Sequence, residues 1–265
     1  MACLRAFKNL ENIKRQSSCF SLIGRCYFRL GNYQDALKYH HKHLEIALQL
    51  GDKGGEGRAY CNIGNAHDSL GNYQDALKYQ HKYLEIALQL GDKGGEGRAY
   101  GNIGAAHYRL GNYQDALKYY HKKLEIASEL GDKGGEGSAY GNIGTAHNSL
   151  GNYQDALKYH HKHLEIALQL GDKGGEGSAY GNIGTAHNSL GNYQDALKYH
   201  HKHLEIALQL GDKGGEGMAY GNIGLAHSAL GNDQDALTNY QNSLSIAKQI
   251  NNINTERLAL QNIEK

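Results

Sequence analysis

The residues in this sequence best suited to chemistry are its 16 histidines. Nine of them form three similar groups: His40, His41 and His43, then His160, His161 and His163, then His200, His201 and His203. A zinc site needs ligands that converge within about 2 Å of the metal. A pair three residues apart on a helix, such as His160 and His163, supplies at most two of them. We therefore predict that these histidines pack between helices or lie on helix surfaces, and we predict no metal site.

No other group of residues resembles an active site. The recurring segment GDKGGEG lacks the GxxxxGK[ST] pattern and the preceding strand of a phosphate-binding loop, and it connects every pair of repeats. No serine, cysteine or carboxylate stands in a unique arrangement with a base. We therefore predict that the protein is not an enzyme, with no catalytic residue and no cofactor.

Charge, hydropathy and cysteine spacing argue against nucleic acid as a partner, against membrane insertion and against an oxidising compartment. Lys and Arg number 28 against 27 Asp and Glu, so no strong field favours nucleic acid or an anionic membrane. No apolar run is long enough to span a bilayer, and the first residues lack the core of a signal peptide. The cysteines show no CxxC spacing, which suits a reducing compartment; they are Cys3, Cys19, Cys26 and Cys61. We predict a cytoplasmic protein without membrane insertion.

The whole chain is built from one repeated unit of 40 residues. Residues 131–170 return letter for letter at 171–210. Close relatives of this unit occupy 11–50, 51–90, 91–130 and 211–250, with partial units at 1–10 and 251–265. This pattern predicts a single solenoid over residues 1–265. The shortened start is either a cap or the cut end of a longer array, and the missing polar face favours a fragment; the last segment suits a capping helix.

Each unit predicts two helices. In residues 51–90, Asp52 is a suitable N-cap, and Tyr60, Ile63 and His67 then follow helical spacing. The first helix is therefore expected over about 53–70. Gly71 ends it, and a second helix runs from about 73 to 90. We expect the mid-helix Gly64 to lie beside Ala76 of the second helix, with the missing side chain allowing close approach.

These positions resemble the tetratricopeptide signature. Tyr60, Ile63, Gly64 and His67 stand where that signature has an aromatic residue, Leu-Gly and Tyr, and Ala76 matches its later alanine. A HEAT-type array has a compatible period, but the Gly64 and Ala76 spacing favours the tetratricopeptide family. The resemblance implies an all-α fold, a right-handed superhelical solenoid of stacked helix-turn-helix repeats, whose first helices line a concave groove.

On this resemblance, a stripe of polar residues opposite the buried face should line the groove. It begins with Arg58, Asn62, Asn65 and Ser69. The asparagine recurs once per repeat, at Asn102, Asn142, Asn182, Asn222 and Asn262. An amide both donates and accepts, so this ladder is predicted to hold the backbone of an extended peptide. The alternative is that the asparagines face water or tie neighbouring helices together. Arg58, Arg98 and Arg109 make the N-terminal half basic, which suits an acidic or polar peptide end.

A closer similarity is to the 40-residue repeats of the Pins/LGN family of G-protein-signalling modulators. The shared segments are the GDKxGE junction, AYGNIG, GNYQDAL and the Tyr-His-x-Lys-His-Leu run. The resemblance implies a scaffold of cell polarity, in the cytoplasm or at the cell cortex, that binds Inscuteable-like or nuclear-mitotic-apparatus-like peptides. No segment resembles the GoLoco motif that binds Gα in that family. The alternative function is a structural or regulatory array that belongs to a larger protein or self-associates through its ends.

Overall fold

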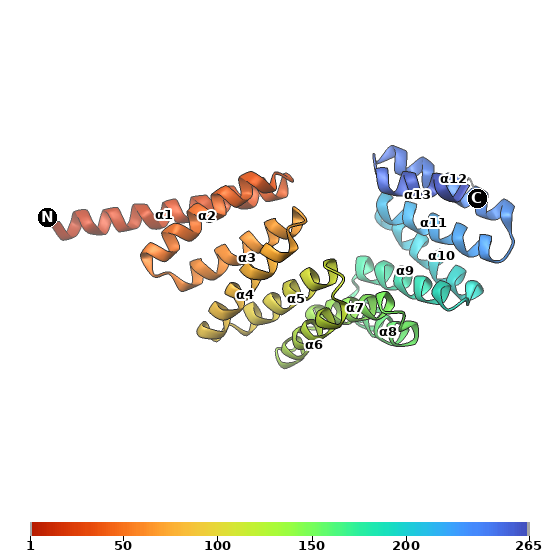
Figure 1. Ribbon diagram of the computed structural model, residues 1–265, viewed down its shortest axis with the longest axis horizontal. Helices are drawn as coiled ribbons and strands as arrows, with labels where there is room; N and C mark the ends of the chain where they lie inside the picture. The colour runs from red at the N-terminus through yellow and green to blue at the C-terminus, as the bar shows by residue number, and fades with distance from the viewer. Residues whose placement is uncertain (1, 264–265) are drawn as a thin grey trace. The chain divides into compact units, whose positions relative to one another are not determined.

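The computed structural model describes the backbone of residues 2–263 and the side chains of residues 11–263. Within that range the chain forms thirteen helices and no strand, which confirms the predicted all-α class (Figure 1). Cys3 lies outside the described side chains. The helices are α1 Ala2–Arg29, α2 Tyr33–Leu50, α3 Lys53–Ser69, α4 Tyr73–Leu90, α5 Lys93–Arg109, α6 Tyr113–Glu129, α7 Lys133–Ser149, α8 Tyr153–Leu170, α9 Lys173–Ser189, α10 Tyr193–Leu210, α11 Lys213–Ala229, α12 Asp233–Gln249 and α13 Ile253–Ile263.

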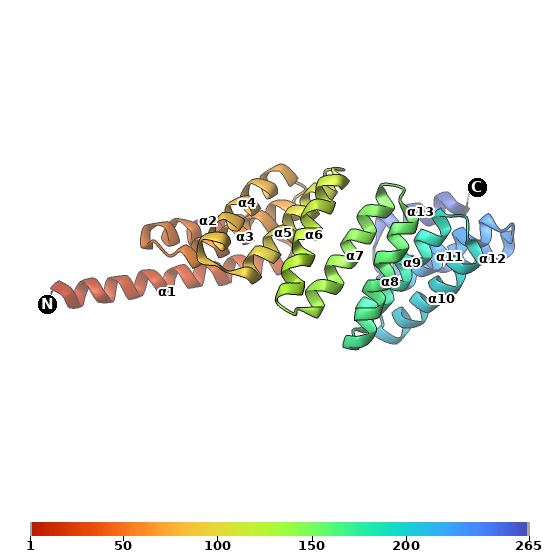
Figure 2. The ribbon, with the colours of Figure 1, turned by 90° about the horizontal axis from the view of Figure 1, so that it is seen from below.

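The helices belong to two compact units, residues 1–131 and 132–265. Within each unit every helix packs against the next one along the chain, as the two ribbon views agree (Figure 2). Odd-numbered helices from α3 onward are the first helices of their repeats, and even-numbered helices are the second. We call a junction the place where two successive first helices flank the second helix between them. The single solenoid over 1–265 stays a prediction.

Glycine and aspartate set the helix boundaries. The Asp52 carboxylate accepts a hydrogen bond of 2.9 Å from the backbone N–H of Gly55, which caps the start of α3. Gly51 and Gly71 have φ of 63° and 79°, a left-handed conformation that side chains disfavour. The first helix predicted over 53–70 is confirmed as Lys53–Ser69, and the second as Tyr73–Leu90.

Helix α1 departs from the repeat pattern. The partial unit 1–10 and the first helix of the next unit are joined, because α1 runs unbroken over 28 residues. The reason lies at Glu11, which occupies the place of Gly51 in the following repeat. Without glycine the chain has no low-cost route into the left-handed turn, so the helix continues.

The mid-helix glycine makes room for a side chain of the second helix. A Cβ placed on Gly64 would lie 2.5 Å from Nε2 of Gln80, and its three nearest atoms all belong to Gln80. The expected partner, Ala76, was therefore wrong, because the side chain one turn later on α4 fills the gap. We call this residue the plug of the junction. The buried plugs are His40, Gln80, Tyr120, His160, His200 and Tyr240.

Candidate functional site

The predicted ladder asparagines all lie half-buried on first helices. This holds for the six of them: Asn62, Asn102, Asn142, Asn182, Asn222 and Asn262. Five of these make no side-chain hydrogen bond to another described residue, and Asn102 is the exception described below. Five amide groups therefore keep their donors and acceptors available at the surface.

The α1–α3 junction contains a pocket of about 170 Å³. Asn62 and Asn65 of α3 form one wall, and Arg25 and Arg29 of α1 form the other. The plug His40 lies at its base, and burial lowers the pKa of its imidazole to about 4, with His43, His41 and Arg25 acting in the same direction. The pocket thus combines two exposed guanidinium groups with two amides above a neutral ring.

Arg25 and Arg29 were missing from the predicted site. They occupy the places of Asn65 and Ser69 one repeat earlier, so the 40-residue register could have identified them. The predicted stripe began at Arg58 and left out the equivalent positions of the repeat 11–50. The structure places these two arginines opposite Asn62 and makes this end more basic than predicted.

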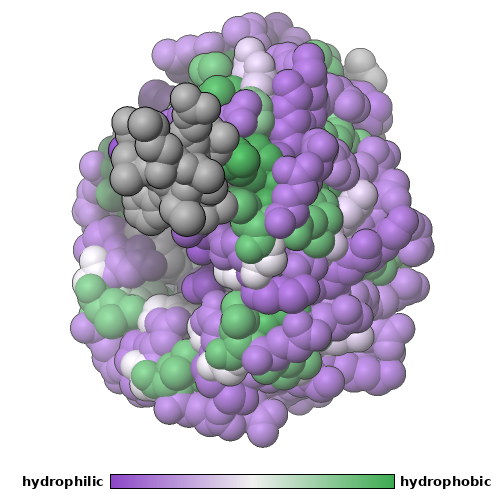
Figure 3. Space-filling model, turned by 90° about the vertical axis from the view of Figure 1, so that its left-hand side faces the viewer, coloured by the Kyte–Doolittle hydropathy of each residue, from purple (hydrophilic) through white to green (hydrophobic). Residues whose placement is uncertain are grey.

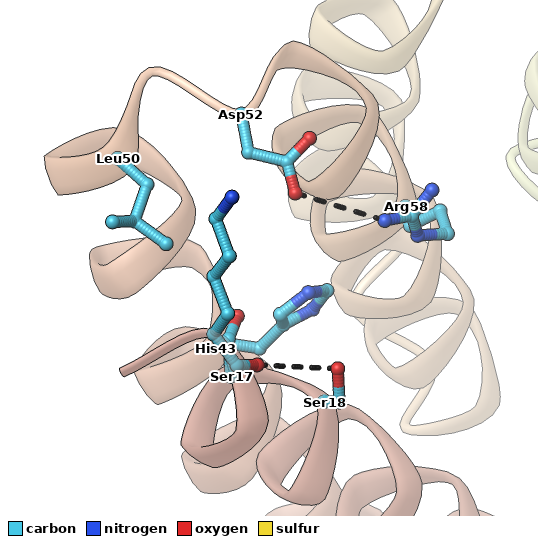
Figure 4. Close-up of a pocket in the computed structure, with 7 residues that line it drawn as sticks. Ser17, Ser18, His43, Leu50, Asp52 and Arg58 are labelled. Atoms are coloured by element: carbon cyan, nitrogen blue, oxygen red, sulfur yellow. Dashed lines mark hydrogen bonds and ion pairs between the residues drawn. The ribbon is translucent and has the colours of Figure 1, made fainter. Parts of the chain in front are cut away.

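A second pocket of about 500 Å³ opens in the same junction, toward the N-terminal end of α3. Figure 4 shows the ring of His43 between Ser17 and Ser18 on one side and the Asp52–Arg58 pair on the other. The guanidinium of Arg58 lies 3.8 Å from the Asp52 carboxylate, and both side chains are about half exposed or more, at 65% and 49%. Such an exposed pair is weak, so Arg58 can exchange Asp52 for another anion.

The α3–α5 junction is closed by an amide network. The Asn102 side-chain N–H donates to Oδ1 of Asn65 and to Oε1 of Gln80, both at 3.2 Å. Gln80 in turn donates to Asn65 Oδ1 at 2.8 Å and to the Cys61 carbonyl at 3.2 Å. Burial raises the pKa of the Cys61 thiol to about 11, which keeps it protonated beside these amides. At this junction, Asn65 and Asn102 tie neighbouring helices together; their part in peptide binding stays a prediction.

Replacing Asn102 by alanine is expected to lower the free energy of unfolding by about 1 to 2 kcal/mol, because Asn65 and Gln80 lose a donor in a part-buried place. Asn142→Ala is the matched control, since its amide makes no such bond, and should stay within about 0.5 kcal/mol of wild type. Urea unfolding followed by circular dichroism measures both. Equal losses in the two variants would contradict the structural role of Asn102.

The remaining predicted arginines differ in how tightly they are held. Arg98 donates from Nε to the Tyr83 hydroxyl at 3.2 Å and lies 3.6 Å from the Asp92 carboxylate. Arg109 is exposed at the end of α5, close enough to lower the pKa of Asp68 against the larger, opposite effect of burial. Arg98 is therefore fixed in place, whereas Arg109 stands at the surface.

The α11–α13 junction of the second unit holds a pocket of about 230 Å³ of a different character. Asn222 and Asn262 flank it, one repeat apart. Met218, Leu225 and Leu258 also line it, and none of the lining residues that the structure describes is charged. The ladder asparagines thus border a basic pocket in the first unit and an apolar one in the second.

Comparison with known families identifies the architecture. A model of the tetratricopeptide repeat matches residues 17–89, 96–169 and 175–249, and another matches 56–130. The chain belongs to the tetratricopeptide repeat family. The tetratricopeptide interpretation of the Gly64 and Ala76 spacing is confirmed over a HEAT-type array. The closer resemblance to Pins/LGN repeats stays a prediction.

Solved tetratricopeptide structures share this fold. The chain is similar to a signal transduction ATPase with a tetratricopeptide repeat sensor from Pyrococcus horikoshii, at a TM-score of 0.76 and 20% identity, over 96% of this chain and 42% of that one. For the apo form of RapI the TM-score is 0.75 at 16% identity, covering 94% and 95%. For a Rap protein complexed with Competence and Sporulation Factor it is 0.69 at 14% identity, covering 94% and 74%. Identities this low show the tetratricopeptide fold alone.

Histidines of this tetratricopeptide chain pack against aromatic rings of neighbouring helices. His67 of α3 stacks on Tyr79 of α4 with ring centroids 5.4 Å apart and planes 6° apart, so it packs between these two helices. Among the described residues, no group of three or more His, Cys, Asp or Glu is arranged to hold a metal ion. Over the same range, none of the helices has the length and hydropathy that crossing a bilayer requires.

Proposed function

We propose that this chain is a protein-interaction scaffold that binds extended segments of other proteins along its first helices. One observation carries the proposal. Ladder asparagines border a pocket in each unit, Asn62 in the first and Asn222 with Asn262 in the second, and the amides of these three residues have no partner within the described protein. An amide pairs with a peptide group whatever the side chain, so such a row suits an extended backbone. The Rap protein complexed with Competence and Sporulation Factor supports the proposal by analogy of fold.

The first unit favours an acidic segment. The two pockets of the α1–α3 junction are lined by Lys14, Arg25, Arg29 and Arg58, and among the described lining residues Asp52 is the one carboxylate. Exposed guanidinium groups form paired, charge-assisted hydrogen bonds with carboxylates. The finer proposal, drawn from the repeat wording, is a Pins/LGN-like adaptor of the cytoplasm or cell cortex that holds Inscuteable-like or nuclear-mitotic-apparatus-like peptides.

The Arg25→Ala, Arg29→Ala double variant tests this function. Its affinity for a fluorescent acidic Inscuteable-like peptide should fall about tenfold to a hundredfold, because two charge-assisted contacts are lost. The affinity of wild type should also weaken with added salt. Fluorescence anisotropy measures the binding. Arg15→Ala is the control, since Arg15 lies on α1 outside both pockets, paired with Glu11 at 3.5 Å.

Wild type that fails to bind acidic, neutral and basic peptides alike would refute the scaffold function. Binding that survives the double variant unchanged would remove the α1–α3 junction from the site. Circular dichroism of each variant separates lost contacts from lost folding.

A second candidate function is self-association, which an apolar patch on α1 favours. Leu22, Ile23, Cys26, Tyr27 and Leu30 line an apolar hollow, and Leu22 and Leu30 are 57% and 80% exposed. In inner repeats the equivalents of Ile23 are fully buried. Figure 3, viewed from the end where α1 begins, shows apolar areas within a mostly hydrophilic surface. Light scattering that gives a mass rising with concentration, abolished by Leu22→Asp, would favour this function; a constant monomer mass would exclude it.

A further inference from the structure

The α11–α13 pocket owes its opening to one small residue at its base. In the two preceding repeats the position of Ser243 is held by His163 and His203. A Cβ on Gly141 or Gly181 would lie 3.1 or 3.0 Å from Nδ1 of those imidazoles, so the rings fill the space beside each glycine. At Gly221 the neighbour is the Ser243 hydroxyl, 3.4 Å from the corresponding point.

Ser243 is also fully engaged elsewhere. Its hydroxyl donates a hydrogen bond of 2.8 Å to the Gly217 carbonyl and is buried. It therefore leaves the volume of the absent imidazole empty and adds no polar group that needs a partner there. The plug Tyr240 completes the base of the pocket.

The walls change in the same place. Met218 stands where the two preceding repeats have Ser138 and Ser178, and Leu225 where they have Thr145 and Thr185. Met218, Leu225 and Leu258 are 55%, 41% and 53% exposed, so this junction presents apolar surface to water on both sides. Covering such surface is favourable, and the described lining of this pocket carries no charge that would require an ionic partner.

We infer that this pocket is a side-chain subsite that selects an aliphatic residue in a bound, extended segment. The aliphatic side chain enters between Met218, Leu225 and Leu258, and the amides of Asn222 and Asn262 hold the backbone on either side of it. The inference rests on the proposed function, and it names the neutral, aliphatic chemistry of the residue that the second unit accepts. A charged side chain is excluded because it would lose its hydration without gaining a counterion.

Methionine labelling gives a direct test, because the sequence contains only Met1 and Met218. In protein with ¹³C-methyl methionine, the Met218 signal is followed while the capped pentapeptide Ser-Asn-Leu-Asn-Ser is added. A matched pentapeptide with aspartate at the centre serves as the control. The Met218 signal should shift saturably with the leucine peptide, and the aspartate peptide should bind at least about tenfold more weakly.

Ser243→His restores the residue of the preceding repeats and should abolish the shift by refilling the pocket. Leu225→Thr also restores a residue of the preceding repeats and should lower the affinity for the leucine peptide about threefold to tenfold. It is the variant to use if Ser243→His fails to fold. No shift with the leucine peptide, equal shifts with both peptides, or a shift unchanged in these variants would overturn the inference. Because the scaffold function is tested at Arg25 and Arg29 in the other unit, failure of the aliphatic subsite can be distinguished from failure of the scaffold function.

Discussion

Lowering the pH from 7 to 5 should reduce the free energy of unfolding, summed over the two units, by about 6 kcal/mol. The reason is that three of the plugs are buried neutral histidines. Burial lowers the pKa of His40, His160 and His200 from 6.5 to about 4. Between pH 6.5 and 4 the unfolded chain binds protons that the folded chain refuses, so stability is complete above pH 6.5 and falls as the pH drops toward 4. At pH 5 the loss is about 2 kcal/mol for each histidine.

Cationic and imidazole neighbours reinforce this loss. His161 and His163 face His160, His201 and His203 face His200, and the causes of the His40 shift also include Arg25. Protonating any plug would therefore place a charge in a desolvated space beside groups that cannot neutralise it.

The chain supplies its own control for this prediction. Gln80 is a plug that does not titrate, so the triple variant His40→Gln, His160→Gln, His200→Gln keeps the shape of a natural junction. Urea unfolding at pH 7 and pH 5 should show a much smaller difference for this variant than for wild type. A pH dependence as steep as that of wild type would assign the acid sensitivity to other groups.

Alanine at Gly144 should lower the free energy of unfolding by about 1 to 3 kcal/mol, although alanine normally favours helices. Its Cβ would lie 2.6 Å from two atoms of the His160 ring, and that ring is 0% exposed and cannot swing into solvent. Either the ring leaves its place or α7 and α8 separate.

Gly134→Ala is the opposite case on the same helix. The nearest atom to its Cβ would be the Asp132 carboxylate oxygen at 3.5 Å, an ordinary contact, and the position is exposed. This variant should gain about 0.5 to 1 kcal/mol through helix propensity. Thermal or urea unfolding compares the two, and a His160→Ala background should relieve the clash at Gly144. A neutral Gly144→Ala would mean that the glycine does not house the plug.

The sequence was sufficient to predict the helix boundaries because glycine and aspartate mark them. Gly51, Gly71 and Asp52 each have a local chemical reason to end or begin a helix. The same chemistry explains why α1 continues where Glu11 stands in place of glycine.

Contacts across helices could not be predicted in the same way. Spacing along one helix does not determine which turn of the neighbouring helix supplies the side chain opposite Gly64, so Ala76 was expected in place of Gln80. Repetition reveals the row of asparagines along the first helices. It does not reveal that Asn102, unlike the other five, donates a hydrogen bond to Gln80. The pocket above Ser243 exists because serine replaces the larger histidine of the preceding repeats, and the space that this leaves is visible only in three dimensions.

The interchangeable plugs have a consequence for how such a protein changes over generations. His, Gln and Tyr occupy equivalent positions on the second helices, and each fills the space beside the mid-helix glycine of its own repeat. Gene duplication that copies a 40-residue unit therefore adds a glycine together with the plug that fills the space beside it, and later substitutions can change the plug while the glycine is kept. The identical segments 131–170 and 171–210 are one such starting point, and Ser243 with Met218 shows how far a copy can diverge.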